Sequence, residues 1–477
     1  MLHWLALTIL TAAAVLAGSD PAVTIRAISA RSAGSWAVKA VELASGKVIV
    51  DVNAEKTLVP ASNAKLFSSA LALSRLGPNH RFHTRVLLNG GDLVLVGGGD
   101  PSFSVRKIPY DKDDQFDNPM APMEELAAKI AAAGVRRIDG DVIGDDTLYE
   151  WNPYPDGWSV DDPLYEYGAP VSALTFNDSK MVLMVHRDLG VTLSPPLEHF
   201  AIQSSVTAGP KTRMFLERPT SSRDLRVWGT LSRESWTELI AVEDPALFAA
   251  RALYEALTAR GVEIRGSPVA RHRPQGIAYQ APEGREIARR TSPPLIDLLK
   301  VINKVSQNLH AELMLRAAGG VDELTKFLGE IAVDPALYHF EDGSGLSRLT
   351  LVAPEALIKL LTHMHGKFGE RWVDLLPVGG EDGTLERRFR GYSKANAVHA
   401  KTGTLSHVSA LSGYAETEQF GRVVFSVIVN AHNTQSAVAR QAVDDIAMTL
   451  VDGNAVSARL AAQRRRTAPV KRVTRGK

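Results

Sequence analysis

Three short segments, far apart in the chain, carry hydroxyl, amine and amide side chains that together could perform nucleophilic catalysis. The segments contain Ser62 and Lys65; Ser306, Gln307 and Asn308; and Lys401, Thr402, Gly403 and Thr404. Serine is a weak nucleophile at neutral pH and needs a base beside it. The first segment supplies a candidate pair, the second adds a hydroxyl and an amide, and the third adds a cation and a strand edge.

The spacing of Ser62 and Lys65 suits a serine nucleophile activated by a lysine. Residues three apart on a helix share a face, so the amine of Lys65 can reach the hydroxyl of Ser62. A lysine that is partly withdrawn from water, near another cation, loses its proton more readily and can act as a base. The plainer alternative is a helix-terminal serine followed by a solvated lysine.

The order of the three segments is more specific than any one of them. Ser-x-x-Lys occurs again at Ser104 and Lys107, where we expect it to be accidental. Alone, Ser306 could cap a helix, Asn308 could be a turn amide and Lys401 a surface lysine. The ordered set Ser-x-x-Lys, Ser-x-Asn and Lys-Thr-Gly is rare and closely matches motifs of penicillin-binding proteins and serine β-lactamases.

The elements around these motifs predict how they are positioned. Residues 36–43 and 48–52 indicate two strands of a hairpin, and an apolar helix from Ser62 follows, ending at Gly77-Pro78. Ser62 would then lie at a helix start, where free backbone N–H groups and the helix dipole favour negative charge. Ser306 and Asn308 fall between two helices, and Lys401 begins a strand.

The long separation between the first two motifs indicates a divided catalytic domain. We expect residues 20–85 and 285–455 to form an α+β domain, an antiparallel sheet with helices around it. Between them, residues 86–284 alternate short apolar segments with glycine and proline turns, which is typical of inserted β-rich modules. The fold class is therefore α+β and multi-domain.

The two ends of the chain differ in composition from its 477-residue whole, which has a net charge of +1 and no cysteine. Residues 1–18 contain an uncharged apolar run followed by small residues, which predicts a signal peptide and an exported protein, in the periplasm or at the cell wall. An uncleaved anchor is the alternative. Residues 456–477 form a basic tail, which we expect to be solvated, or to attach weakly to anionic wall polymers or lipids. Nothing in the global charge indicates nucleic acid as a partner.

The chain resembles the D-alanyl-D-alanine carboxypeptidases/endopeptidases of the class C penicillin-binding proteins (the penicillin-binding protein 4 type, peptidase family S13). Besides the three motifs and the large insertion, the resemblance rests on residues 97–101, 144–146, 167–174, 342–348 and 383–385. The sequence departs from the family at Gln307, where Asp is usual, and has Thr404 where Ser is also common.

The resemblance implies a penicillin-binding-protein transpeptidase fold, a Ser62 acyl-enzyme, peptidoglycan stem peptides as substrates and covalent binding of β-lactams, with no metal or cofactor. It implies that Lys65 is the base, that Ser306 relays a proton, and that Asn308 holds both the substrate and Lys65. It implies that Lys401, Thr402, Gly403 and Thr404 form the electrostatic segment that binds the substrate carboxylate. The backbone N–H groups of Ser62 and Thr404 would form the oxyanion hole.

Two other functions remain open from the residues. The same serine chemistry could serve a β-lactamase or esterase, although no second base for the deacylating water is evident, and a non-catalytic wall-binding homologue is the other alternative. Several further polar residues have plainer explanations: Asp145 and Asp146 as loop caps, His363 and His365 pointing apart on a helix, and structural roles for His399 and His407. A polar loop with Asp162, Tyr165 and Glu166 could meet substrate.

Overall fold

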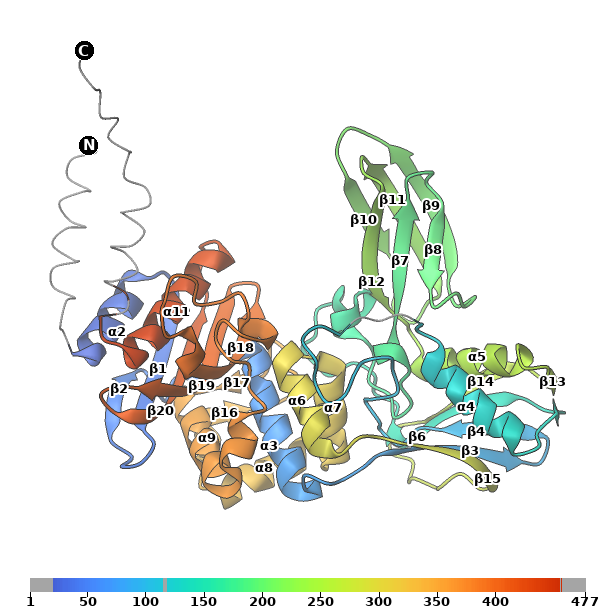
Figure 1. Cartoon of the computed structure of the whole chain (residues 1–477), viewed down its shortest axis with the longest axis horizontal. Coiled ribbons are helices and arrows are strands. Elements are labelled where there is room, and N and C mark those ends of the chain that lie inside the picture. The colour runs from blue at the N-terminus through green and yellow to red at the C-terminus, as the bar shows by residue number, and fades with distance from the viewer. Residues whose placement is uncertain (1–19, 115–117, 455, 457–477) are drawn as a thin grey trace, which may run out of the picture.

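The structure is a computed structural model that describes residues 20–114, 118–454 and 456. The predicted signal peptide, residues 1–18, lies outside the described residues, as does the predicted basic tail apart from Val456. Among the helices that are described, none is long and apolar enough to cross a membrane. The chain forms a site-bearing lobe, a second lobe and a projecting arm (Figure 1).

The site-bearing lobe is built on a five-stranded antiparallel sheet with the strand order β18-β19-β20-β1-β2. Its strands are β1 (Ser35–Glu42), β2 (Val48–Val52), β18 (Val398–Leu405), β19 (Val408–Thr417) and β20 (Gly421–Asn430). The first and last parts of the chain thus share one sheet, in which Trp36 pairs with Val429. The expected hairpin, β1 with β2, is present.

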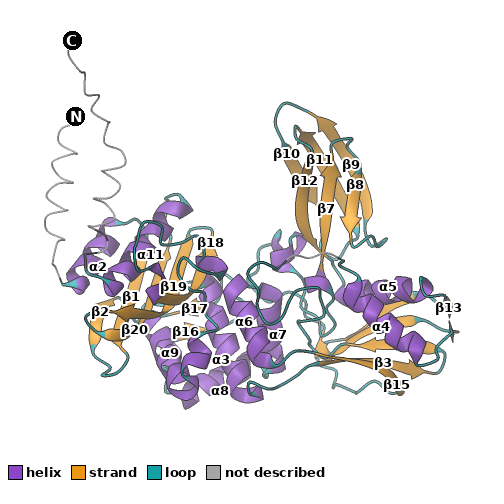
Figure 2. Cartoon of the chain, in the orientation of Figure 1, coloured by secondary structure: helices purple, strands orange, loops and turns teal. Residues whose placement is uncertain are grey.

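Helices cover both faces of this sheet (Figure 2). On one face lie α2 (Pro21–Arg31) and α11 (Ser436–Val451), and on the other α3 (Lys65–Leu76) and α9 (Pro354–Phe368). Because both faces are covered, β20 is buried continuously from Val423 to Val429, which explains its unbroken apolar sequence. This arrangement confirms the expected antiparallel sheet surrounded by helices.

A helical layer continues from α3 toward the second lobe (Figure 1). This layer contains α6 (Leu295–Val305), α7 (Asn308–Ala317) and α8 (Gly320–Glu330). The short helix α10 (Glu370–Val373) packs against α9, and the short strands β16 (Tyr338–His339) and β17 (Leu351–Val352) pair with each other. Short 3-10 turns are η1 (Ala61–Ala64), η2 (Asp162–Leu164), η3 (Glu166–Gly168), η4 (Asn177–Ser179), η5 (Pro335–Leu337), η6 (Gly383–Leu385) and η7 (Ala395–Ala397). The apolar face of α3 packs against α6, α7 and α9 in one core.

The second lobe has its own five-stranded sheet, with the order β14-β6-β4-β3-β15. It comprises β3 (His83–Asn89), β4 (Asp92–Val96), β6 (Val142–Glu150), β14 (Pro268–Arg273) and β15 (Arg285–Thr291), with α4 (Ala121–Ala132), α5 (Pro245–Thr258), β5 (Arg137–Ile138) and β13 (Glu263–Ile264) alongside. Because β15 pairs with β3, we propose 83–291 as the inserted region in place of the expected 86–284.

The arm projects from the second lobe as two three-stranded sheets (Figure 1). One contains β7 (Lys180–His186), β8 (Val191–Ser194) and β12 (Ser235–Ala241); the other contains β9 (Ala201–Ala208), β10 (Arg213–Glu217) and β11 (Asp224–Leu231). Leu183 and Val185 of one sheet and Leu225 and Val227 of the other belong to a core shared with the second lobe. The arm therefore shares one hydrophobic core with the second lobe.

Candidate active site

Ser62 lies in a tight turn between the sheet and α3. The sequence predicted a helix beginning at Ser62, whereas the structure has the 3-10 turn η1 there and α3 begins at Lys65. Ala61 has a positive φ of 48°, an uncommon conformation for a residue with a side chain. Strand β18 lies in close contact with this turn, because a Cβ at Gly403 would lie 2.5 Å from the carbonyl oxygen of Pro60. Glycine is therefore required at position 403.

The amine of Lys65 is fully buried and surrounded by three oxygens. Its Nζ lies 2.8 Å from Ser62 Oγ, 2.6 Å from Asn308 Oδ1 and 2.7 Å from the carbonyl oxygen of Ser344. The Asn308 amide is oriented by its Nδ2, which donates to the carbonyl of Tyr167 at 2.8 Å. A neutral amine has two hydrogens and one lone pair. Because both hydrogens are donated, to Asn308 Oδ1 and to the Ser344 carbonyl, the lone pair is available to accept the hydroxyl proton of Ser62.

The surroundings lower the pKa of Lys65 to about 7, because burial disfavours the ammonium. The carboxylates of Asp342 and Glu312 act in the opposite direction. A substantial fraction of the amine is thus neutral near pH 7, as a general base requires.

Ser306 lies next to Lys401. It is the C-terminal cap residue of α6 and lies in the left-handed region, with φ 63° and ψ 40°. Lys401 Nζ donates to Ser306 Oγ and to the carbonyl of Thr402, both at 2.9 Å. Burial, and then the nearby Lys65, hold the pKa of Lys401 well below its usual range. Lys65 therefore lowers the proton affinity of Lys401.

The motifs open onto one cleft of about 520 Å³. Its lining includes Ser62, Ser306, Thr384, Thr402, Thr404, Arg387, Arg390, Arg440 and Phe389. Thr402 Oγ1 lies 2.8 Å from Thr384 Oγ1. The hydroxyls of Ser62 and Ser306 and the cationic arginine side chains thus meet in a space large enough for a short peptide.

Several residues at this site were not singled out as site residues from the sequence. They are Ser344, Glu312, Asp342, Thr384, Tyr167 and the cleft arginines. Ser344 and Tyr167 act through backbone carbonyls, which every residue carries, so no side-chain pattern marks them. Glu312 did leave a signal, since it follows Asn308 by one helical turn and shares its face.

Other candidate residues lie elsewhere or have structural partners. Ser104 Oγ accepts from the backbone of Arg106, and Lys107 pairs with Asp111 on the surface. Asp145 caps its own loop at Thr147, and Asp146 binds His272 and Ser172. Among the described residues, no cluster of three histidine or acidic side chains could hold a metal ion.

Comparisons with known proteins agree with this geometry. The family profile for the D-Ala-D-Ala carboxypeptidase 3 (S13) family matches residues 25–450. A D-alanyl-D-alanine carboxypeptidase of Actinomadura sp. strain R39 is 31% identical over 87% of this chain and 81% of its own.

Solved structures show the same fold. Penicillin-binding protein 4 of Haemophilus influenzae superposes with a TM-score of 0.76 at 22% identity, over 89% of this chain and 98% of that chain. The same protein complexed with a β-lactam gives a TM-score of 0.71 at 21% identity, over 90% and 99%. The resemblance seen in the sequence is confirmed, and the chain belongs to the D-Ala-D-Ala carboxypeptidase 3 (S13) family.

Proposed function

We propose that this protein is a serine D,D-peptidase that hydrolyses the bond between the two D-alanines of peptidoglycan stem peptides. The observation that carries the proposal is the hydrogen bonding of Lys65: two of its three partners can only accept, so its lone pair faces Ser62. Family membership supports the substrate class.

Acylation begins when Ser62 Oγ attacks the carbonyl carbon of the penultimate D-alanine and its proton passes to Lys65 Nζ. The backbone N–H groups of Ser62 and Thr404 stabilise the oxyanion, a contribution that typically amounts to about 3–4 kcal/mol per donor. Ser306, bound to Lys401, relays the proton from Lys65 to the leaving nitrogen as the C–N bond breaks, which returns Lys65 to its neutral form. The terminal D-alanine departs, and its carboxylate is attracted by Lys401, Thr402 and Thr404.

Deacylation uses the same base. Water attacks the ester carbon, its proton passes to Lys65, and Ser62 leaves and recovers a proton, which restores the resting enzyme. A β-lactam acylates Ser62 by the same first step, and its ring-opened amine remains attached, so the adduct persists. Cleavage of cross-bridges between stem peptides is the same reaction with a longer leaving group.

Digestion of purified muropeptides by wild type and Ser62→Ala tests the assignment. The wild type is expected to release D-alanine from pentapeptides, and Ser62→Ala to release none. Equal products from both would refute the Ser62 mechanism. Sustained turnover of a chromogenic cephalosporin after the burst would favour a β-lactamase, and absence of a benzylpenicillin adduct on Ser62 would favour a non-catalytic wall-binding protein.

The cellular location follows from the same proposal. Peptidoglycan lies outside the cytoplasmic membrane, and residues 1–18 have the composition of a signal peptide. We therefore infer export to the periplasm or cell wall, with the basic tail of residues 456–477 as a weak attachment to anionic polymers. Sequencing the amino terminus of the exported protein tests this: an intact residue 1 would contradict cleavage.

A further inference from the structure

We propose that Glu312 is a positioning residue for the reaction, because it fixes the loop of residues 342–347 whose Ser344 carbonyl holds the amine of Lys65. The proposal rests on the base role of Lys65 and extends the site to a fourth segment of the chain. That segment, Asp342-Gly343-Ser344-Gly345-Leu346-Ser347, contributed to the family resemblance but belongs to none of the three catalytic motifs.

Glu312 binds the loop through two consecutive backbone N–H groups. Its Oε1 accepts from Ser344 N at 2.7 Å, and Gly343 N lies 3.0 Å from each carboxylate oxygen. All three residues are buried, so these charge-assisted bonds form away from water, where they are strong. Helix α7 thus reaches Lys65 twice, directly through Asn308 and indirectly through Glu312.

The loop has little freedom to relax. Asp342 accepts from Ser344 Oγ at 3.0 Å, from Ser347 N at 2.9 Å and from Thr350 Oγ1 at 2.8 Å. A Cβ at Gly345, whose φ is +75°, would lie 1.9 Å from the carbonyl oxygen of Ala61. The loop therefore lies directly against the turn that carries Ser62, and its position determines where the Ser344 carbonyl points.

Glu312 also faces several charged groups. It interacts electrostatically with Lys65 of α3, with Asp342 of the loop and with Arg316, one turn further along α7, and Lys401 of β18 lies beyond Lys65. Burial, and then Asp342, raise the pKa of Glu312 above its ordinary value.

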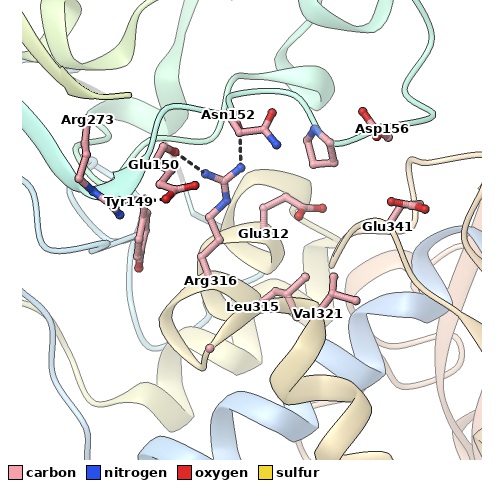
Figure 3. Close-up of a pocket in the computed structure, with 13 residues that line it drawn as sticks. Tyr149, Glu150, Asn152, Asp156, Arg273, Glu312, Leu315, Arg316, Val321 and Glu341 are labelled. Atoms are coloured by element: carbon pink, nitrogen blue, oxygen red, sulfur yellow. Dashed lines mark hydrogen bonds and ion pairs between the residues drawn. The ribbon is translucent and has the colours of Figure 1, made fainter. Parts of the chain in front are cut away.

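On its other side Glu312 lines a cavity of about 510 Å³, with Glu150, Asp156, Arg273 and Glu341 (Figure 3). Arg316 crosses this cavity to bind the backbone carbonyls of Glu150 and Asn152.

The test is the pH dependence of Ser62 acylation by a fluorescent penicillin, measured for wild type, Glu312→Gln, Glu312→Asp and Glu243→Gln. Glutamine keeps one acceptor oxygen but removes the charge that favours the Lys65 ammonium. The pH at which the acylation rate declines, the acid limb of the profile, should move down by at most about one unit, because the raised pKa of Glu312 leaves its carboxyl only partly ionised in that range. The maximal rate at high pH, the plateau, should also be lower. Aspartate keeps the charge, but its side chain is one methylene shorter, so its carboxylate lies further from the loop. The plateau of the acylation rate should therefore fall about 100-fold, while the pH at which the rate declines stays the same.

Glu243→Gln is the matched control, because Glu243 is a buried carboxylate bound to His199 in the second core. Its acid limb and plateau should match those of the wild type. The proposal is overturned if either Glu312 variant, folded by circular dichroism, keeps both the wild-type plateau and the wild-type acid limb. Failure of the peptidase function is a separate result: the wild type would be acylated by penicillin yet leave D-Ala-D-Ala peptides intact.

Discussion

At the scale of single residues, opposing forces set the basicity of Lys65. Burial alone would drive the amine to its neutral form, whereas Asp342 and Glu312 favour the ammonium. The result, a pKa of about 7, lies where a base is both deprotonated and still able to hold a proton.

We expect the acylation rate of the wild type to rise with pH and to level off above an apparent pKa of about 7. The sign follows from the mechanism, since only the neutral amine can accept the proton of Ser62. Lys65→Arg should abolish acylation at every pH, because a guanidinium stays protonated. The control Lys359→Arg, at a surface contact with the Ala332 carbonyl, should behave as wild type. Adduct formation measured by mass spectrometry decides this.

At the scale of elements, the site depends on strand β18 fitting closely against the turn η1. Gly403 makes this contact possible, because a Cβ there would also lie 3.3 Å from the Cβ of Ala61. The obstructing atoms at Pro60 and Ala61 belong to the backbone or are bound directly to it, so the turn cannot yield without moving Ser62.

We therefore expect Gly403→Ala to displace β18 and to lower the acylation rate about 100-fold, since misplacements near 1 Å can have that effect. The control is Gly366→Ala within α9, where a Cβ would meet nothing within 4 Å. That change should leave acylation intact and stabilise the fold by about 0.5–1 kcal/mol. Acylation kinetics and denaturant unfolding of both variants distinguish a local displacement from a general loss of stability.

At the scale of the whole molecule, the inserted region supports the active site. Asp178, in η4, lies 2.8 Å from His310 Nε2 of α7 and 2.7 Å from Arg106. Although burial opposes ionisation, Arg106, His310 and Lys180 hold the pKa of Asp178 well below its ordinary value. Tyr167 of the same region orients Asn308. The two lobes are therefore joined beside the catalytic groups.

Asp178→Asn should destabilise the protein by about 3–5 kcal/mol, because it removes a buried carboxylate from between cationic partners. Glu234→Gln, which breaks a surface ion pair with Arg187, should change stability by less than about 1 kcal/mol. Denaturant unfolding of the full chain measures both changes. Equal unfolding midpoints for the two variants would show that the buried contacts of Asp178 with Arg106 and His310 contribute little to stability.

The sequence predicted the parts of the site that depend on local side-chain patterns. Ser62, Lys65, Ser306, Asn308 and the segment from Lys401 lie in recognisable motifs, and the structure brings them together, although Ser62 lies in the 3-10 turn η1 and not at the start of a helix.

The rest depends on tertiary contacts that leave no local signature. The Ser344 carbonyl is a backbone group, and the support from Glu312 exists only once α7 meets the loop of residues 342–347. The pairing of β15 with β3 is also hidden in the sequence, because β15 carries the charged residues Arg285, Glu286, Arg289 and Arg290 and does not look like a strand by itself.

Strand β18 lies at the edge of its sheet. Another segment pairs with only one end of its outer edge. The segment 377–379 pairs with Val398 to Ala400, which leaves the stretch from Lys401 to Leu405 facing the cleft. An extended peptide can be added there as a further strand, held by main-chain amides irrespective of its side chains. Such an edge would accept stem peptides of differing residue composition and leave discrimination among them to the walls of the cleft.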